Sequence, residues 1–264
     1  VIPMHCKAII PMLGVLAVLF SACGVASQPV SMATASPHVQ IATYSATARV
    51  QTGKVTAVSV SCQPGEQMLG GGFSSSDLFE YAAFIDASYP SSATTWTVTA
   101  ASAPSFRVEA DVYCLPAVVP LSIQIVRATG SPAGRVACPQ RTVLLGGGYQ
   151  SSQPIGVSHP QSNGWMSAAV SASVQIYALC ATSHVLRGQV VTSVFNAHSS
   201  SHSYAPESGG VVCPAGQTAT GGGFEGEDLI VGSYATRPGF AGWSVAAGGD
   251  TDVTLSVVCG AIQA

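Results

Sequence analysis

The sequence predicts an all-β protein made of three copies of one structural unit, because one residue pattern occurs three times. Each copy opens with a cysteine, and a run of three glycines begins eight residues later: Cys62 and Gly70, Cys138 and Gly146, Cys213 and Gly221. An aromatic residue, a tryptophan and a closing cysteine follow in each copy: Phe73, Trp96, Cys114; Tyr149, Trp165, Cys180; Phe224, Trp243, Cys259. A pattern that recurs at such an interval is typical of repeat architectures.

The residues before each closing cysteine alternate between an apolar and a mixed face. In the first copy the cysteine's side carries Val108, Ala110, Val112 and Cys114. The same two-residue period precedes Cys180 and Cys259, and Val58, Val60 and Cys62 share a face at the opening end. This period indicates β-strands whose cysteines point into a core.

Other segments also have strand character. These are 41–50, 121–126 and 190–195 before the opening cysteines, and 96–100, 165–169 and 243–247 from each tryptophan. Glycine, proline and serine separate them, and no helical apolar period occurs beyond the N-terminal leader. We therefore expect about four strands in each copy and about twelve in total.

Two architectures fit three equivalent groups of four strands. One is a β-prism, in which three four-stranded sheets surround a pseudo-threefold axis, and the alternative is a β-trefoil. The copies, 39–116, 117–181 and 182–264, are long for a trefoil, and a cysteine pair within each copy suits a self-contained sheet. We therefore prefer the prism. We expect a single all-β domain over 39–264 rather than three small sandwiches, because one copy has little core of its own.

The N-terminal residues predict export. An apolar stretch of 13 residues, Ala8 to Phe20, is too short to cross a bilayer, and Ser21-Ala22-Cys23 follows it. Residues 1–23 resemble a lipoprotein signal peptide in which Cys23 is lipidated, and residues 24–38 suit a flexible tether. We expect a cell-surface lipoprotein held to the membrane by its lipid; the alternative is ordinary cleavage after Ala26 and a secreted protein.

The cysteine count also favours an extracytoplasmic location. Beyond the leader, six cysteines remain, two in each copy, and six cysteines allow 15 pairings in principle. The repetition favours Cys62–Cys114, Cys138–Cys180 and Cys213–Cys259, and such bridges belong in an oxidising compartment. No cysteine or histidine pair has zinc-ligand spacing. We expect neither a metal nor a cofactor.

Charge excludes some partners. Charged residues make up 8% of the chain and the net charge is −3, so the sequence has neither the basic footprint of a nucleic-acid-binding protein nor a polybasic membrane patch. The sequence does not indicate an oligomeric state.

One resemblance rests on these motifs. Cys-Pro-Ala-Gly followed by Gly-Gly-Phe, from Cys213 to Phe224, and then a closing cysteine resembles the repeats of vitelline membrane outer layer protein I, a three-repeat β-prism. The full Cys-Pro, triple-glycine, tryptophan and cysteine pattern is more similar to a repeat of exported bacterial proteins without an assigned function. The resemblance implies a fold only, because the acidic and asparagine positions of the eggshell family are not matched here.

Most of the repeated motifs have a structural interpretation. Glycine triplets within strands mark bulges or close backbone approaches, and the tryptophans begin strands whose other side chains are small or apolar. The residues before three prolines, Tyr89, His159 and Arg237, are the candidate ligand-binding positions, expected in exposed loops before each tryptophan. Variation at a tolerant surface is the alternative explanation for them.

No catalytic pattern stands out, so we expect a binding protein or an envelope-structural protein, with a glycan or envelope component as the candidate partner. The alternatives are a hydrolase with a site in asymmetric loops, for which 77–89 with Phe84 and Asp86 is the best candidate, or an inert spacer. Acidic residues near Glu225 and the pair His198 and His202 are weak metal candidates. An enzyme needs one pocket with converging polar groups, whereas a lectin-like module has shallow, repeat-related sites.

Overall fold

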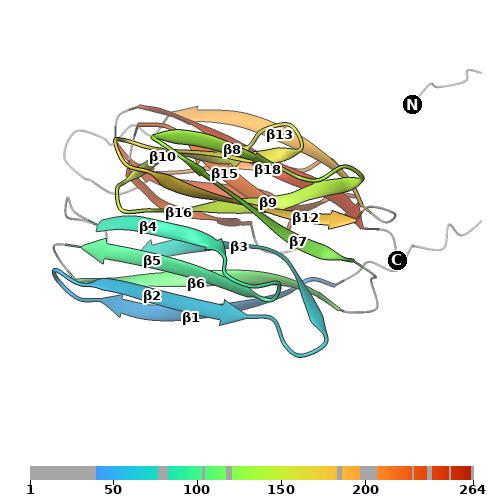
Figure 1. Cartoon of the computed structure of the whole chain (residues 1–264), viewed down its shortest axis with the longest axis horizontal. Coiled ribbons are helices and arrows are strands. Elements are labelled where there is room, and N and C mark those ends of the chain that lie inside the picture. Colours follow the sequence, from blue (N-terminus) through green and yellow to red (C-terminus); the bar gives the residue numbers. More distant parts are fainter. Residues whose placement is uncertain are drawn as a thin grey trace, which may run out of the picture. The chain divides into compact units, whose positions relative to one another are not determined.

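The described part of the chain consists of β-strands joined by turns (Figure 1). The computed structural model describes residues 40–76, 83–102, 105–116, 121–182, 186–196, 207–227, 229–236, 240–249 and 251–262. Within these ranges no helix has the length and apolar character needed to cross a membrane. The expected signal peptide (1–23), its Cys23 and the expected tether (24–38) lie outside the described residues.

Each expected copy contributes six strands. The first holds β1 (Ala42–Val50), β2 (Val55–Ser61), β3 (Glu66–Ser76), β4 (Ala83–Pro90), β5 (Thr95–Ser102) and β6 (Phe106–Pro116). The second holds β7 (Ile123–Gly130), β8 (Ala133–Ala137), β9 (Thr142–Ser151), β10 (Ile155–Pro160), β11 (Gly164–Ala169) and β12 (Val174–Thr182). The third holds β13 (Leu186–Asn196), β14 (Glu207–Val212), β15 (Thr218–Glu225), β16 (Leu229–Ala235), β17 (Gly242–Gly248) and β18 (Asp252–Ile262).

The expectation of four strands per copy is therefore wrong. The additional strands are the glycine-containing third strand of each copy and the fourth strand that follows it: β3 and β4, β9 and β10, β15 and β16. A run of glycines shows no apolar alternation, so the third strands gave no period-two pattern from which to predict them.

The strands form three six-stranded sheets. Sheet 1 has the order β1-β6-β3-β16-β17-β14, sheet 2 the order β2-β5-β4-β9-β12-β7, and sheet 3 the order β13-β18-β15-β10-β11-β8. Each sheet takes three strands from one copy and three from another, so no copy forms a self-contained sheet. All three exchanges use the same position, with the third strand of one copy pairing with the fourth strand of another: β3 with β16, β9 with β4, and β15 with β10.

Three disulfide bonds join the sheets. The bridges are Cys62–Cys114, Cys138–Cys180 and Cys213–Cys259, the pairing predicted from the repetition. Cys62 follows β2 of sheet 2, whereas Cys114 lies in β6 of sheet 1. The other two bridges connect the remaining pairs of sheets in the same way. Disulfides of this kind indicate an extracytoplasmic, oxidising environment.

The tryptophans and the glycine runs form the repeated part of the core. Each indole Nε1 donates to a buried serine Oγ on the neighbouring fourth strand: Trp96 to Ser88 at 3.0 Å, Trp165 to Ser158 at 2.9 Å, and Trp243 to Ser233 at 2.8 Å. The middle glycine of each run lies against its own copy's tryptophan ring, where a Cβ would overlap the ring. The prediction that these motifs serve packing is confirmed.

The first glycine of each run follows a β-bulge, and the third faces a neighbouring backbone. The bulged residues Leu69, Leu145 and Thr220 are buried. A Cβ on Gly72, Gly148 or Gly223 would overlap the carbonyl of Ser233, Ser88 or Ser158. These serines lie on the fourth strands at the exchange positions, so the glycines permit the strand exchange between copies. Residues of all three copies line one central cavity of about 10 Å³.

Candidate functional site

Two of the three predicted ligand-binding residues lie on strands, not in exposed loops as expected. Tyr89 is in β4 and His159 is in β10, and both side chains are partly buried. The prolines that follow them, Pro90 and Pro160, are the last residues of their strands and pair with Trp96 and Trp165. A strand end tolerates proline because its missing N–H need not continue the ladder.

The third predicted residue cannot be compared in the same way. Arg237 lies outside the described residues. In the third copy Ala235 pairs with Trp243 and Tyr234 pairs with Ser244, as Tyr89 pairs with Thr97 in the first copy. Tyr234 is therefore the counterpart of Tyr89 and His159. Counting back from Trp243 to Pro238 did not identify Tyr234, because the turn between β16 and β17 is longer than the equivalent turns of the other two copies.

Tyr89 belongs to an aromatic cluster on sheet 2. Its ring stacks on Tyr177 of β12, with ring centroids 4.7 Å apart and an interplanar angle of 24°. The exposed guanidinium of Arg127, in β7, lies 5.3 Å from the Tyr177 ring centroid, within cation–π range. Burial, and next the neighbouring Tyr89, raise the pKa of Tyr177, and Arg127 acts in the opposite direction.

His159 has a different environment. Its Nε2 lies 3.6 Å from Oε2 of Glu225 in β15, and its Nδ1 is 2.9 Å from the carbonyl of Pro160. The histidine side chain is 16% exposed and the glutamate side chain 57% exposed. Tyr89 and His159 thus occupy equivalent register positions in sheets 2 and 3, but contact different chemical groups. Tyr89 and His159 therefore have the same place in the fold, but they would not offer the same chemical groups to a ligand.

A second repeated feature lies on the same fourth strands. Each has a β-bulge at one place, between Ile85 and Ala87 in β4, between Ile155 and Val157 in β10, and between Ile230 and Gly232 in β16. The extra residues are Asp86, Gly156 and Val231. A bulge inserts an unpaired residue and redirects its side chain, and bulges are common beside functional sites.

Asp86 lines a surface groove of about 600 Å³, which we call the Asp86 groove. Its lining includes Phe84, Asp86, Thr99, Gln150, Gln153 and Pro154. Gln150 connects the groove with the aromatic cluster, because its Oε1 lies 3.0 Å from the hydroxyl of Tyr177. The groove therefore combines a carboxylate, amide and hydroxyl groups, and an aromatic side chain.

Burial raises the pKa of the half-buried Asp86 carboxyl. On the neighbouring strand β9, the buried hydroxyl of Tyr149 donates to the carbonyl of Ile85 at 3.2 Å, at the bulge. Burial, with a smaller contribution from Asp86, raises the pKa of Tyr149 far above its ordinary range, so Tyr149 stays neutral and acts as a hydrogen-bond donor. Among the described residues, no side chain forms a hydrogen bond or ion pair with Asp86, and burial is the single cause of its raised pKa.

A related groove of about 410 Å³ lies at the bulge of β10, and we call it the Gly156 groove. Pro154, Ile155, Gly156, Ala169, Val170 and Glu227 are among its lining residues. It occupies the seam between β10 and β15, as the Asp86 groove occupies the seam between β4 and β9. The two grooves receive their carboxylate from different elements. In the Asp86 groove it comes from the fourth strand, and in the Gly156 groove it comes from the residues after β15.

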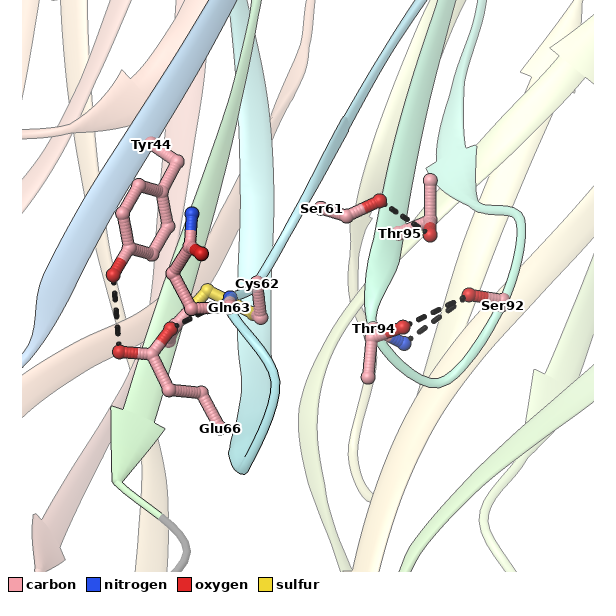
Figure 2. The surroundings of a disulfide bond; sticks show 9 residues. Tyr44, Ser61, Cys62, Gln63, Glu66, Ser92, Thr94 and Thr95 are labelled. Carbon is pink, nitrogen blue, oxygen red and sulfur yellow. Dashed lines mark hydrogen bonds between the residues drawn. A yellow bond between two sulfur atoms is a disulfide. The ribbon is translucent and has the colours of Figure 1, made fainter.

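One group of potential metal ligands surrounds a disulfide (Figure 2). A carboxylate oxygen of Glu66 and the sulfurs of Cys62 and Cys114 all lie within 4.8 Å of one another. The sulfurs are bonded to each other, so neither is a thiolate ligand. The carboxylate accepts hydrogen bonds from the Tyr44 hydroxyl at 3.0 Å and from the Gln63 backbone N–H at 2.9 Å. This arrangement is structural.

Several other predicted sites fall partly or wholly outside the described residues. These are Phe79, Glu80 and Tyr81 of the hydrolase loop, the pair His198 and His202, and the acidic residues Asp228 and Asp250. The structure does describe Phe84 and Asp86, but it places both on strand β4 and not in a loop, and both line the Asp86 groove. The groove itself was missed, because it forms where two copies exchange strands. Comparisons with protein-family models and with curated proteins gave no match to this chain.

Proposed function

We propose that this is an exported, lipid-anchored surface protein that binds a glycan of its envelope surroundings through the Asp86 groove on sheet 2. The observation that carries the proposal is the occurrence of two surface grooves at equivalent seams of the fold. Repeat-related surface grooves are expected of a lectin-like module, whereas an enzyme concentrates its polar groups in one pocket.

The lining of the Asp86 groove suits a sugar. Carbohydrates present hydroxyl donors and acceptors beside apolar C–H faces. The Asp86 carboxylate accepts hydrogen bonds, the side-chain amides of Gln150 and Gln153 both donate and accept, and the ring of Phe84 offers an apolar surface. Such a combination of apolar lining and a few placed polar groups is usual in small-molecule sites, and the groove volume falls in their range.

The fold provides a rationale for a binding module. We propose that the three copies surround a pseudo-threefold axis, as in a β-prism. The cyclic exchange of third and fourth strands and the central cavity lined by all three copies support this arrangement. In such a scaffold the core residues are held by packing, while the extra residue of each fourth-strand bulge differs between copies: Asp86 and Gly156 are partly exposed, and Val231 is buried. Equivalent seams can then carry grooves with different linings.

A screen of the exported protein on a glycan array tests the proposal. We expect binding to a restricted set of glycans, and we expect Asp86→Asn to weaken it at least about tenfold, because the carboxylate accepts charge-assisted hydrogen bonds. Asp252→Asn is the matched control, since Asp252 is an exposed carboxylate on β18 that lines neither groove. Absence of glycan binding, or equal effects of the two variants, would argue against the proposal.

The anchor has its own experiment. Cys23→Ala removes the residue that a lipoprotein pathway would modify, so we expect the protein to leave the membrane fraction. Wild-type protein with an unlipidated N-terminus would instead support ordinary signal cleavage. The hydrolase alternative predicts product release from a bound glycan. Among the described residues Asp86 is the single carboxylate that lines its groove, whereas most glycosidases use a pair.

A further inference from the structure

The two grooves meet at one residue. Strand β9 ends at Ser151 in sheet 2 and β10 begins at Ile155 in sheet 3, so the connection 152–154 passes between the sheets. Pro154, at its end, lines both the Asp86 groove and the Gly156 groove. The carbonyl of Pro154 also accepts a hydrogen bond from the N–H of Val170 at 3.3 Å, which ties the connection to another residue that lines the Gly156 groove.

The charges of both grooves have one sign. Asp86 is the charged residue lining the first groove and Glu227 the charged residue lining the second, and no lysine or arginine of the described chain lines either. An ionised carboxylate only accepts hydrogen bonds, so each groove favours hydroxyl or ammonium donors. It disfavours a ligand that carries carboxylate or sulfate groups, because like charges repel at short range.

Neutral hydrogen-bonding groups outnumber these charges. The Asp86 groove is also lined by Thr99, Gln150, Ser151, Ser152 and Gln153, whereas the Gly156 groove is mainly aliphatic apart from Glu227. A cationic peptide would be better served by several carboxylates than by one in each groove. A sugar chain suits both grooves. Its hydroxyl groups can form hydrogen bonds in the Asp86 groove, and its C–H faces can pack against Pro154 and Val170.

We infer that one linear glycan without acidic groups crosses Pro154 and occupies both grooves at once. This inference rests on the proposed glycan-binding function and names the ligand as an extended neutral or amino-sugar chain. The bulge glycine contributes to the path. A Cβ on Gly156 would lie 2.9 Å from the carbonyl of Gly226, so glycine lets the β15 end approach closely and carry Glu227 to the groove.

Calorimetric titration with sugar chains of increasing length tests the inference. The probes are neutral cello-oligosaccharides and deacetylated chito-oligosaccharides of two to eight sugars, with oligogalacturonates and a lysine-rich peptide for comparison. We expect affinity for a neutral or amino-sugar series to rise by at least about tenfold with chain length and then level off. Once a chain is bound in the first groove, its binding in the second groove is intramolecular and adds contacts. Glu227→Gln should weaken only the long chains, whereas Asp86→Asn should weaken short and long chains alike.

Other outcomes separate the two proposals. Glycan binding that is independent of chain length or unaffected by Glu227→Gln would overturn the continuous path, and equally strong binding of oligogalacturonates would overturn the choice of a glycan without acidic groups. Each of these outcomes leaves the proposed function in place. Preference for the lysine-rich peptide, or failure of every sugar series to bind, would overturn both. Asp252→Asn is the control that should leave every titration unchanged, and circular dichroism checks that each variant is folded.

Discussion

Trp165 donates a hydrogen bond from its indole N–H to the hydroxyl of Ser158 at 2.9 Å, with both side chains buried where β10 pairs with β11. Trp96 with Ser88 and Trp243 with Ser233 repeat this relationship. A buried indole N–H needs an acceptor, and a serine on the adjacent strand supplies one without disturbing the ladder. The same pair therefore fixes the fourth strand to the fifth in every copy.

Replacing Ser158 by alanine leaves the indole N–H of Trp165 buried without its acceptor. We expect a loss of about 1–3 kcal/mol in the free energy of unfolding, because an unsatisfied buried donor keeps its full desolvation cost. Urea titration followed by tryptophan fluorescence measures the loss. Ser61→Ala is the control, since the hydrogen bond between the Ser61 and Thr95 hydroxyls is exposed and its removal should cost much less. Equal losses would contradict this role of Ser158.

Adding one methyl group at Gly147 tests the close packing of the glycine run. A Cβ there would overlap the Trp165 ring and the carbonyl of Tyr177. Since overpacking a rigid core displaces backbone, we expect Gly147→Ala to cost about 3 kcal/mol or more. Gly248→Ala is the matched control, because a Cβ at Gly248 meets no atom within 4 Å. Thermal unfolding of the two variants should differ clearly, and similar melting temperatures would show that the core can yield.

Arg141 occupies a position where the other two copies have glycine. Its φ is 66°, and the equivalent turn residues Gly65 and Gly216 have φ values of 86° and 79°. A left-handed conformation costs a residue with a Cβ about 1–2 kcal/mol. Because glycine also gains freedom in the unfolded chain, we expect Arg141→Gly to stabilise by only about 0.5–1 kcal/mol. Gly216→Ala should destabilise the third turn, and an unchanged midpoint for both variants would refute this explanation.

Features that depend on local pattern were predictable from the sequence. The all-β class and the strands at the closing cysteines follow from a two-residue period, and the three bridges follow from repetition. The buried tryptophans and the tightly packed glycines were also anticipated, since both residue types have few roles within a strand.

Features that depend on pairing between copies were not predictable. Alternation shows which side of a strand faces the core, but not which strand lies beside it, so the strand exchange between β4 and β9 left no trace in the sequence. The same limit concealed the groove, because Asp86 and Gln150 come from different copies. Proline spacing also failed to identify Tyr234, since the β16–β17 turn differs in length from its counterparts.

The ionised carboxylate of Asp86 is expected to lower the stability of the fold and to strengthen ligand binding. Burial raises its pKa in the folded protein above the value in the unfolded chain. The stability it contributes is therefore present at pH values below the unfolded pKa and is lost as the pH rises through the folded pKa. Asp86→Asn should accordingly match the wild type near pH 3 and become the more stable protein near pH 7.

Urea titrations at pH 3, 5 and 7 measure this difference. The exposed Asp252→Asn variant should show no such rise with pH, which separates the effect of a half-buried carboxylate from a change in net charge. A variant that is more stable at pH 7 yet binds glycan less tightly is what a ligand-binding carboxylate predicts, because a functional group is often held at some cost to the fold. If Asp86→Asn were instead less stable at pH 7, the carboxylate would have a stabilising partner in the folded chain, and its availability to a ligand would be refuted.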